Sequence, residues 1–126
     1  MRLLLDTHIL LWWLKDDPLL PPRAGVLIED RRNQVFVSAM SMWEIAIKSH
    51  LGKLKADVDE VRTAALQSGF QPLPFALDHA VAVARLPQHH RDPVDRALLA
   101  QALLEPLNLL THDEHLAVYG DHVLLV

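Results

Sequence analysis

The sequence contains no cysteine, only four glycines among 126 residues, and no long uninterrupted apolar run. The missing cysteines exclude disulfide bonds, thiolate metal sites and cysteine nucleophiles, so any bound metal must use oxygen or imidazole ligands. No apolar run reaches the roughly 18 residues of a membrane span, and Asp6 interrupts the first apolar run too early for a signal peptide. We therefore expect a cytoplasmic protein that contacts no membrane.

Basic residues are also too few for a protein that holds nucleic acid mainly by neutralising phosphates. Twelve Lys and Arg residues against 16 Asp and Glu residues give a formal net charge of −4. This charge argues less strongly against nucleic-acid binding if several acids share one pocket and divalent cations neutralise them. The hydrophobic content of 51% is high enough to leave an apolar surface for a partner. The length predicts a single domain spanning residues 1–126.

Short apolar stretches alternate with helical patterns along the whole chain. This alternation predicts βα units and an α/β fold with a mostly parallel sheet. The predicted strands are 3–5, 35–37, 70–74, 108–111 and 123–126. The predicted helices are 7–15, one opened by Pro21-Pro22 and running through about Glu29, one capped by Ser38 or Ser41 and running toward Gly52, 57–67, 78–86, 92–105 and a short one through 119.

Two carboxylates stand at the start of the predicted helix that begins near residue 92. Asp92 is a good N-cap, and Pro93 suits the first helical turn because its missing N–H needs no partner there. Asp95 follows one turn into the helix, on the same face as Leu98 and Leu99. Because these leucines are apolar, that face is expected to turn toward the core. A carboxylate on that face is costly without a partner, although interaction with the helix dipole is the simpler explanation of Asp95.

Three further acids are placed where they can meet Asp95. Asp6 and Asp113 each follow a predicted strand, and active sites of parallel sheets lie beyond the carboxyl ends of the strands. Glu44 lies in the apolar middle of a helix. Each acid also has a local explanation: Asp6 and Asp113 as N-caps, and Glu44 as the i,i+4 partner of Lys48, worth only about 0.2–0.5 kcal/mol.

Four converging carboxylates repel one another unless a cation neutralises them. Hard divalent ions with oxygen ligands do this, with Mg²⁺ or Mn²⁺ as the usual occupants. Such ions promote phosphodiester hydrolysis, so that reaction is predicted. Thr7 and Thr111 offer hydroxyls to position a water or a carboxylate, with packing or capping as the alternative. His90 and Arg91 are expected to face the phosphates of the substrate.

The candidate acids lie in four short segments, which occur in a fixed order along the chain. They are Leu4-Leu5-Asp6-Thr7-His8, Val37-Ser38-Ala39 leading to Trp43-Glu44-Ile45-Ala46-Ile47-Lys48, His90-Arg91-Asp92-Pro93-Val94-Asp95-Arg96, and Leu109-Leu110-Thr111-His112-Asp113. These segments resemble the successive motifs of the PIN-domain ribonucleases, and in particular the VapC-type toxins of bacterial type II toxin–antitoxin modules. The resemblance implies a three-layer α/β/α fold around a five-stranded sheet and Mg²⁺- or Mn²⁺-dependent endonucleolytic cleavage of RNA. It also implies that Asp6, Glu44, Asp95 and Asp113 bind the metal, with Asp92 as an accessory acid.

The resemblance further implies two protein partners. One is a second copy of the chain, in a homodimer, and the other is a small antitoxin whose C-terminal segment crosses apolar helices and blocks the acidic pocket. We expect the antitoxin on the helix of Trp12 and Trp13, with one tryptophan in the core and the other on the contact surface, or else both buried. One departure from the family pattern is Glu105-Pro106-Leu107, where relatives tend to have glycine; it concerns only the shape of that loop.

Three rival interpretations have specific requirements. A zinc site could use His112 and His115 at i,i+3, whereas the adjacent His89 and His90 should point apart. A phosphoacceptor receiver domain needs a mid-chain aspartate at a strand end and a late lysine, but the middle strand ends at Ser38 and the last lysine is Lys55. A PIN-like scaffold that binds RNA or protein without cutting is the third, and the intact acids argue against it.

Overall fold

A five-stranded sheet with strand order β3-β2-β1-β4-β5 forms the centre of the protein. The computed structural model describes residues 1–126, and every pair of neighbouring strands is parallel. The predicted mostly parallel sheet is therefore confirmed and is parallel throughout, with β3 at one edge as expected for a strand that contains proline. The strands are β1 (Arg2–Leu5), β2 (Gln34–Ser38), β3 (Gln71–Leu73), β4 (Asn108–Thr111) and β5 (Val123–Leu125).

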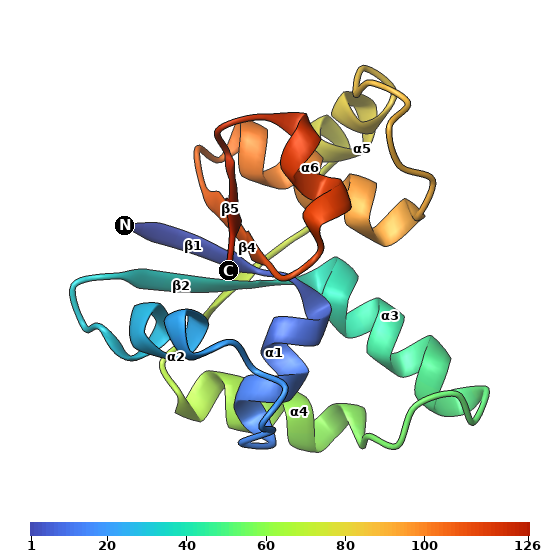
Figure 1. The fold of residues 1–126 in the computed structure, drawn as a ribbon. Helices are drawn as coiled ribbons and strands as arrows, with labels where there is room; N and C mark the ends of the chain where they lie inside the picture. Colours follow the sequence, from blue (N-terminus) through green and yellow to red (C-terminus); the bar gives the residue numbers. More distant parts are fainter.

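Helices cover both faces of this sheet, which confirms the predicted three-layer α/β/α fold (Figure 1). One face carries α1 (Thr7–Leu14), α2 (Pro22–Glu29), α3 (Ala39–His50) and α4 (Val58–Gln67), and the other carries α5 (Leu77–Val83), α6 (Pro93–Leu104) and the 3₁₀ helix Glu114–Tyr119. None of the helices combines the length and apolar character that crossing a bilayer requires.

The alternation of side chains along β1 builds a core on each face. Leu3 and Leu5 pack with α1 to α4, whereas Leu4 packs with α6 on the opposite face, and all three are completely buried. This is the pleat of a strand that is covered on both sides, which explains why β1 is a continuous apolar run.

Two local features differ from or extend the sequence analysis. Helix α5 was predicted to run through Leu86 but ends at Val83. Pro87 has no N–H to donate to the Val83 carbonyl, so the chain continues to Leu86 in i→i−3 turns, and Arg96 donates to the Val83 and Leu86 carbonyls. The loop Glu105–Leu107 needs no glycine, because no residue in it has a positive φ and the Leu107 N–H closes the turn on the Ala102 carbonyl at 2.9 Å.

The packing of α6 predicts unequal costs for two leucines on the same helix. Leu99 is completely buried, whereas Leu103 is 54% exposed. Leu99→Ala should lower the free energy of unfolding by about 2–5 kcal/mol because it leaves a cavity. Leu103→Ala should cost less than about 1 kcal/mol. Urea unfolding followed by circular dichroism measures both, and equal costs would contradict the described packing of α6.

Candidate functional site

The pairing of β1 with β4 brings Asp6 and Asp113 to the same edge of the sheet. The Asp6 N–H donates to the Leu110 carbonyl at 3.0 Å, so the first strand continues into the site in register with β4. Thr111 Oγ1 donates to Asp6 Oδ2 at 2.6 Å and accepts from the Asp113 N–H at 3.1 Å. A single completely buried threonine thus ties the two acids together, consistent with the carboxylate-positioning role predicted for it.

The start of α6 adds Asp95 and His90 to this edge. The Asp92 carboxylate caps α6 by accepting from the Asp95 N–H at 3.0 Å, as the sequence predicted. His90 Nε2 lies 2.7 Å from Asp95 Oδ2. Ligand atoms of His90, Asp95 and Asp113 all lie within 4.8 Å of one another, close enough to share one metal ion. The sequence analysis had placed His90 against substrate phosphates and had not foreseen its contact with Asp95.

Glu44 approaches the site from α3. Its Oε2 accepts from Lys48 Nζ at 3.0 Å, so the local i,i+4 pair is present. Its side chain is nevertheless only 13% exposed, and its charge contributes to the raised pKa of Asp6. The capping alternatives are present as well, because Asp6 accepts from the His8 N–H and Asp113 from the His115 N–H. Asp6 and Asp113 therefore cap helices and also lie in the acidic site.

Burial and the neighbouring negative charges together raise the pKa values of two of the acids. Burial, followed by the charge of Asp6, raises the pKa of Asp95 to about 6. Burial also raises the pKa of Asp6, opposed by the hydrogen bond from Thr111 and reinforced by Glu44. The pKa of Lys48 is raised by the hydrogen bond to Glu44 and by the charges of Asp92 and Asp95. Crowded oxygen ligands with one lysine among them fit a hard divalent cation.

A buried arginine holds the loop that carries His90. Arg96 Nη1 donates to the carbonyls of Pro87 at 2.9 Å and His90 at 3.3 Å, and its Nη2 donates to Val83 at 2.9 Å. The Tyr119 hydroxyl donates to the same Pro87 carbonyl. The sequence analysis missed Arg96; its only signal was its place directly after Asp95.

Two of the predicted accessory residues do not touch the carboxylates. Thr7 Oγ1 donates to Ser41 Oγ at 2.9 Å and so ties α1 to α3. Arg91 is exposed beside the capping Asp92.

The histidines of the zinc alternative are engaged elsewhere. His112 Nδ1 hydrogen bonds to the Val126 carbonyl, and His115 Nδ1 lies 3.0 Å from Asp113 Oδ1. His89 packs on Tyr119 while His90 contacts Asp95, so these neighbours do point apart.

An open hollow of about 270 Å³ adjoins the acids and is lined by Asp6, His8, Trp12, His112 and Asp113. Trp12 and Trp13 are both half-buried, so the expectation of one core and one surface tryptophan is wrong, and so is its alternative of two buried ones. The reason is that Trp12 packs against His112 beside the site while Trp13 packs against Phe70 of the core.

The sequence matches the PIN domain family over residues 3–121. The chain belongs to the PIN domain family. No curated protein matches the sequence. The PIN domain is a nuclease family whose members use divalent metal ions, and the acidic cluster provides ligands of the appropriate kind.

Several solved structures share this PIN fold over nearly the whole chain. VapBC2 from Rickettsia felis bound to a DNA fragment from its promoter matches with TM-score 0.70 and 15% identity, covering 100% of this chain and 98% of that chain. A toxin–antitoxin complex from Klebsiella pneumoniae matches with TM-score 0.66 and 23% identity, and the match covers 96% of this chain and 94% of that chain. FitAcB from Neisseria gonorrhoeae matches with TM-score 0.64 and 20% identity, covering 98% and 96%. At these identities the likeness establishes the fold.

The raised pKa of Asp95 predicts a specific pH dependence of stability in metal-free buffer. Between about pH 4 and pH 6 the folded chain keeps a proton that an unfolded aspartate has released, so the fold loses stability as pH rises through this window. Asp95→Asn should flatten that decline and stabilise the metal-free protein above pH 6 by about 1–3 kcal/mol. Urea unfolding from pH 4 to 8 measures it, with exposed Asp121→Asn as the control. If the free energy of unfolding changed with pH equally in Asp95→Asn and in wild type, the raised pKa of Asp95 would be contradicted.

Proposed function

We propose that this PIN domain, acting as one domain over residues 1–126, is a metal-dependent endoribonuclease. We further propose that it is the toxin of a type II toxin–antitoxin module. The observation that carries the proposal is the grouping of His90, Asp95 and Asp113, whose ligand atoms lie within 4.8 Å of one another. Thr111 joins Asp6 to Asp113, and Glu44 lies close enough for its charge to raise the pKa of Asp6. Acids that raise one another's pKa weaken the metal-free fold, so their presence together is explained by a cation that they bind.

Asp6, Glu44, Asp95 and Asp113 would hold Mg²⁺ or Mn²⁺, with Asp92 as the accessory acid at the helix cap. When bound, the ion supplies charge that lowers the pKa of water, orients a phosphodiester and stabilises the negative charge on the attacked phosphate. Magnesium and manganese suit a site in which carboxylate oxygens dominate.

The surrounding side chains keep the carboxylates ready for this task. Thr111 holds Asp6 by a 2.6 Å hydrogen bond, and His90 Nε2 lies 2.7 Å from Asp95 Oδ2 and so restrains that carboxylate. Lys48 balances part of the charge of Glu44. Exposed Arg91 is free to meet substrate phosphates, which an acidic chain must attract through a few local cations. Thr7 contributes by fixing α1 against α3 rather than by touching the acids.

The receiver-domain alternative has no support in this arrangement. Strand β2 ends at Ser38, whose hydroxyl donates to Gln101 and accepts from the Met40 N–H. The strand end therefore caps a helix and offers no phosphoacceptor carboxylate. Only cleavage itself separates a nuclease from a PIN-like scaffold that binds without cutting.

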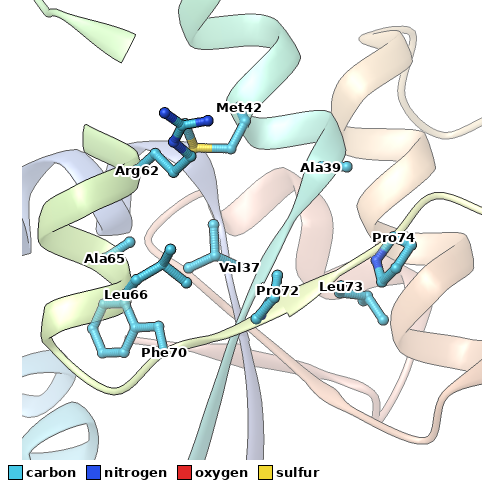
Figure 2. Close-up of a pocket in the computed structure, with 10 residues that line it drawn as sticks. All are labelled: Val37, Ala39, Met42, Arg62, Ala65, Leu66, Phe70, Pro72, Leu73 and Pro74. Carbon is cyan, nitrogen blue, oxygen red and sulfur yellow. The ribbon is translucent and has the colours of Figure 1, made fainter. Parts of the chain in front are cut away.

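The antitoxin is proposed to dock in an apolar groove of about 440 Å³ between α3, α4 and the edge strand β3 (Figure 2). Met42, Leu66 and Phe70 line the groove, and Figure 2 shows Arg62 at its rim beside Met42. An apolar antitoxin segment with an acidic residue facing Arg62 matches this chemistry. Similar solved structures are toxin–antitoxin complexes, which supports such a partner. This groove differs from the surface on α1 that was expected for the antitoxin. Neither Trp12 nor Trp13 lines it, although Trp13 contacts Phe70, which does.

A second copy of the chain is proposed to cover a different surface. Trp43, Ile47 and Leu51 follow one another at i, i+4 and i+8 on α3 and are 53%, 38% and 58% exposed. Such a row on one helix face suits packing against another helix, and it supports the homodimer that the family resemblance implies.

The proposed nuclease activity predicts linked effects on cleavage and on metal binding. Wild-type protein should cleave single-stranded RNA with Mg²⁺ or Mn²⁺ and stop when EDTA removes the ion. Asp6→Asn, Asp95→Asn and Asp113→Asn should each lower kcat/KM about 100-fold or more, because each removes a charge from the ion's site. Mg²⁺ should also raise the Tm of wild type by several degrees and raise that of the three variants less.

The control for these variants is Asp121→Asn, an exposed acid outside the cluster. In cells, expression without an antitoxin should arrest growth, and Asp95→Asn should relieve the arrest. Full RNA cleavage in EDTA, or full toxicity of Asp95→Asn, would refute the proposed roles.

The groove predicts how antitoxin binding responds to a buried charge. Leu66 is 53% exposed at the groove, so Leu66→Asp should leave the fold intact. It would place a carboxylate under the apolar segment and compete for Arg62, which lies one turn earlier on α4. Binding of the antitoxin encoded beside this protein should weaken tenfold or more, as isothermal calorimetry measures. Leu103→Asp, equally exposed on the other face of the sheet, should bind normally. Unchanged affinity for Leu66→Asp would place the antitoxin elsewhere.

A further inference from the structure

The open hollow beside the carboxylates has an aromatic wall that the proposed chemistry does not use. Asp6 caps the start of α1. His8 and Trp12 are related by i,i+4, so they lie on one face of that helix, with Trp12 one turn further from Asp6 than His8. His112 lies between the end of β4 and Asp113, so it reaches the same hollow from the neighbouring strand. The hollow is thus shared by both segments that carry the central acids.

The three rings form a continuous aromatic surface. The Trp12 ring centroid lies 5.8 Å from that of His8, with the planes tilted by 37°. It lies 6.1 Å from that of His112, in an edge-on arrangement with an interplanar angle of 70°. The His112 ring is held in place through its Nδ1, which hydrogen bonds to the Val126 carbonyl. The hydrogen bond orients the His112 ring before any ligand arrives, which lowers the entropic cost of binding one.

The charge of the hollow restricts what can occupy it. Asp6 and Asp113 are part of its lining, so a phosphate group beside them would be repelled unless a cation lay between the phosphate and the acids. A neutral planar ring meets no such repulsion and gains contact with the indole and imidazole faces. The apolar groove of Figure 2 differs, because aliphatic side chains dominate its lining and neither of these two acids contributes to it.

We infer that this hollow is a nucleobase subsite, in which Trp12, flanked by His8 and His112, stacks on a base of single-stranded RNA next to the phosphate held at the carboxylates. The inference rests on the proposed ribonuclease function and names how the substrate is bound. Single-stranded RNA exposes its bases to aromatic side chains, whereas a duplex keeps them stacked inside. Stacking accepts every base, so the subsite selects strandedness more than sequence.

Steady-state cleavage of a single-stranded RNA oligonucleotide tests the subsite. Trp12→Ala should raise KM roughly 5- to 100-fold and leave kcat within about threefold, because stacking holds the substrate and takes no part in the chemistry. Trp12→Phe, which retains an aromatic face, should recover most of the affinity. Trp13→Phe is the matched control, since Trp13 packs on Phe70 outside the hollow. The Mg²⁺ concentration that half-saturates the thermal shift should be the same for all of these variants, which shows that the carboxylates remain in place.

A binding measurement without cleavage separates this inference from the proposed function. The chain has three tryptophans, so the double variant Trp13→Phe/Trp43→Phe reports on Trp12 alone. With Mg²⁺ present, AMP and UMP should quench its fluorescence, while ribose 5-phosphate, which lacks a base, should not.

The outcomes decide the two claims separately. Quenching by the nucleotides in a protein that cleaves no RNA would sustain the base subsite and overturn the proposed nuclease. Equal quenching by ribose 5-phosphate, or an unchanged KM for Trp12→Ala with RNA cleavage intact, would overturn the subsite. Loss of antitoxin affinity in Trp12→Ala with normal RNA kinetics would also overturn it, because the hollow would then belong to the protein partner.

Discussion

Electrostatic repulsion among carboxylates at the edge of a parallel sheet is the constraint on which this structure depends. The register of β1 against β4 places Asp6 beside Thr111, and the start of α6 brings Asp95 within reach of Asp113. Burial in a medium that solvates charge poorly makes this arrangement costly, and the raised pKa values of Asp6 and Asp95 are the direct result. The concentration of negative charge at this edge therefore lowers the stability of the metal-free fold.

The rest of the fold supplies the rigidity that keeps the acids together. Gln101, completely buried on α6, accepts from Ser38 Oγ at 2.5 Å and donates to the Pro74 carbonyl at 3.1 Å. These bonds fix α6 to the ends of β2 and β3 and so fix Asp95 relative to the sheet. Arg96, the residue after Asp95, fixes the loop that precedes α6 by donating to the Pro87 and Val83 carbonyls. Buried polar groups with satisfied hydrogen bonds specify one arrangement in a way that apolar contacts alone do not.

Much of the fold could be predicted because local signals and burial agreed. Asp92 and Pro93 marked the start of α6, Pro72 marked β3 as an edge strand, and the apolar run at Leu3 to Leu5 marked a strand covered on both faces. The placement of Trp12 and Trp13 could not be predicted, because their burial depends on His112 and Phe70, which are remote in the sequence. The end of helix α5 had a local signal, because Pro87 has no N–H for the Val83 carbonyl, to which Arg96 donates instead.

By itself the sequence determined the order of the elements, the parallel sheet and the candidate acids, because hydrophobic period, capping and strand ends are encoded within a few residues. Only the tertiary structure decided which of these acids share a pocket and which groups hold them, such as His90 on Asp95 and Thr111 between Asp6 and Asp113. The same holds for the aromatic wall of the hollow, which joins residues about a hundred positions apart. The physical reason is that strand order and register fix distances between remote residues, and neither is set by the residues near each acid.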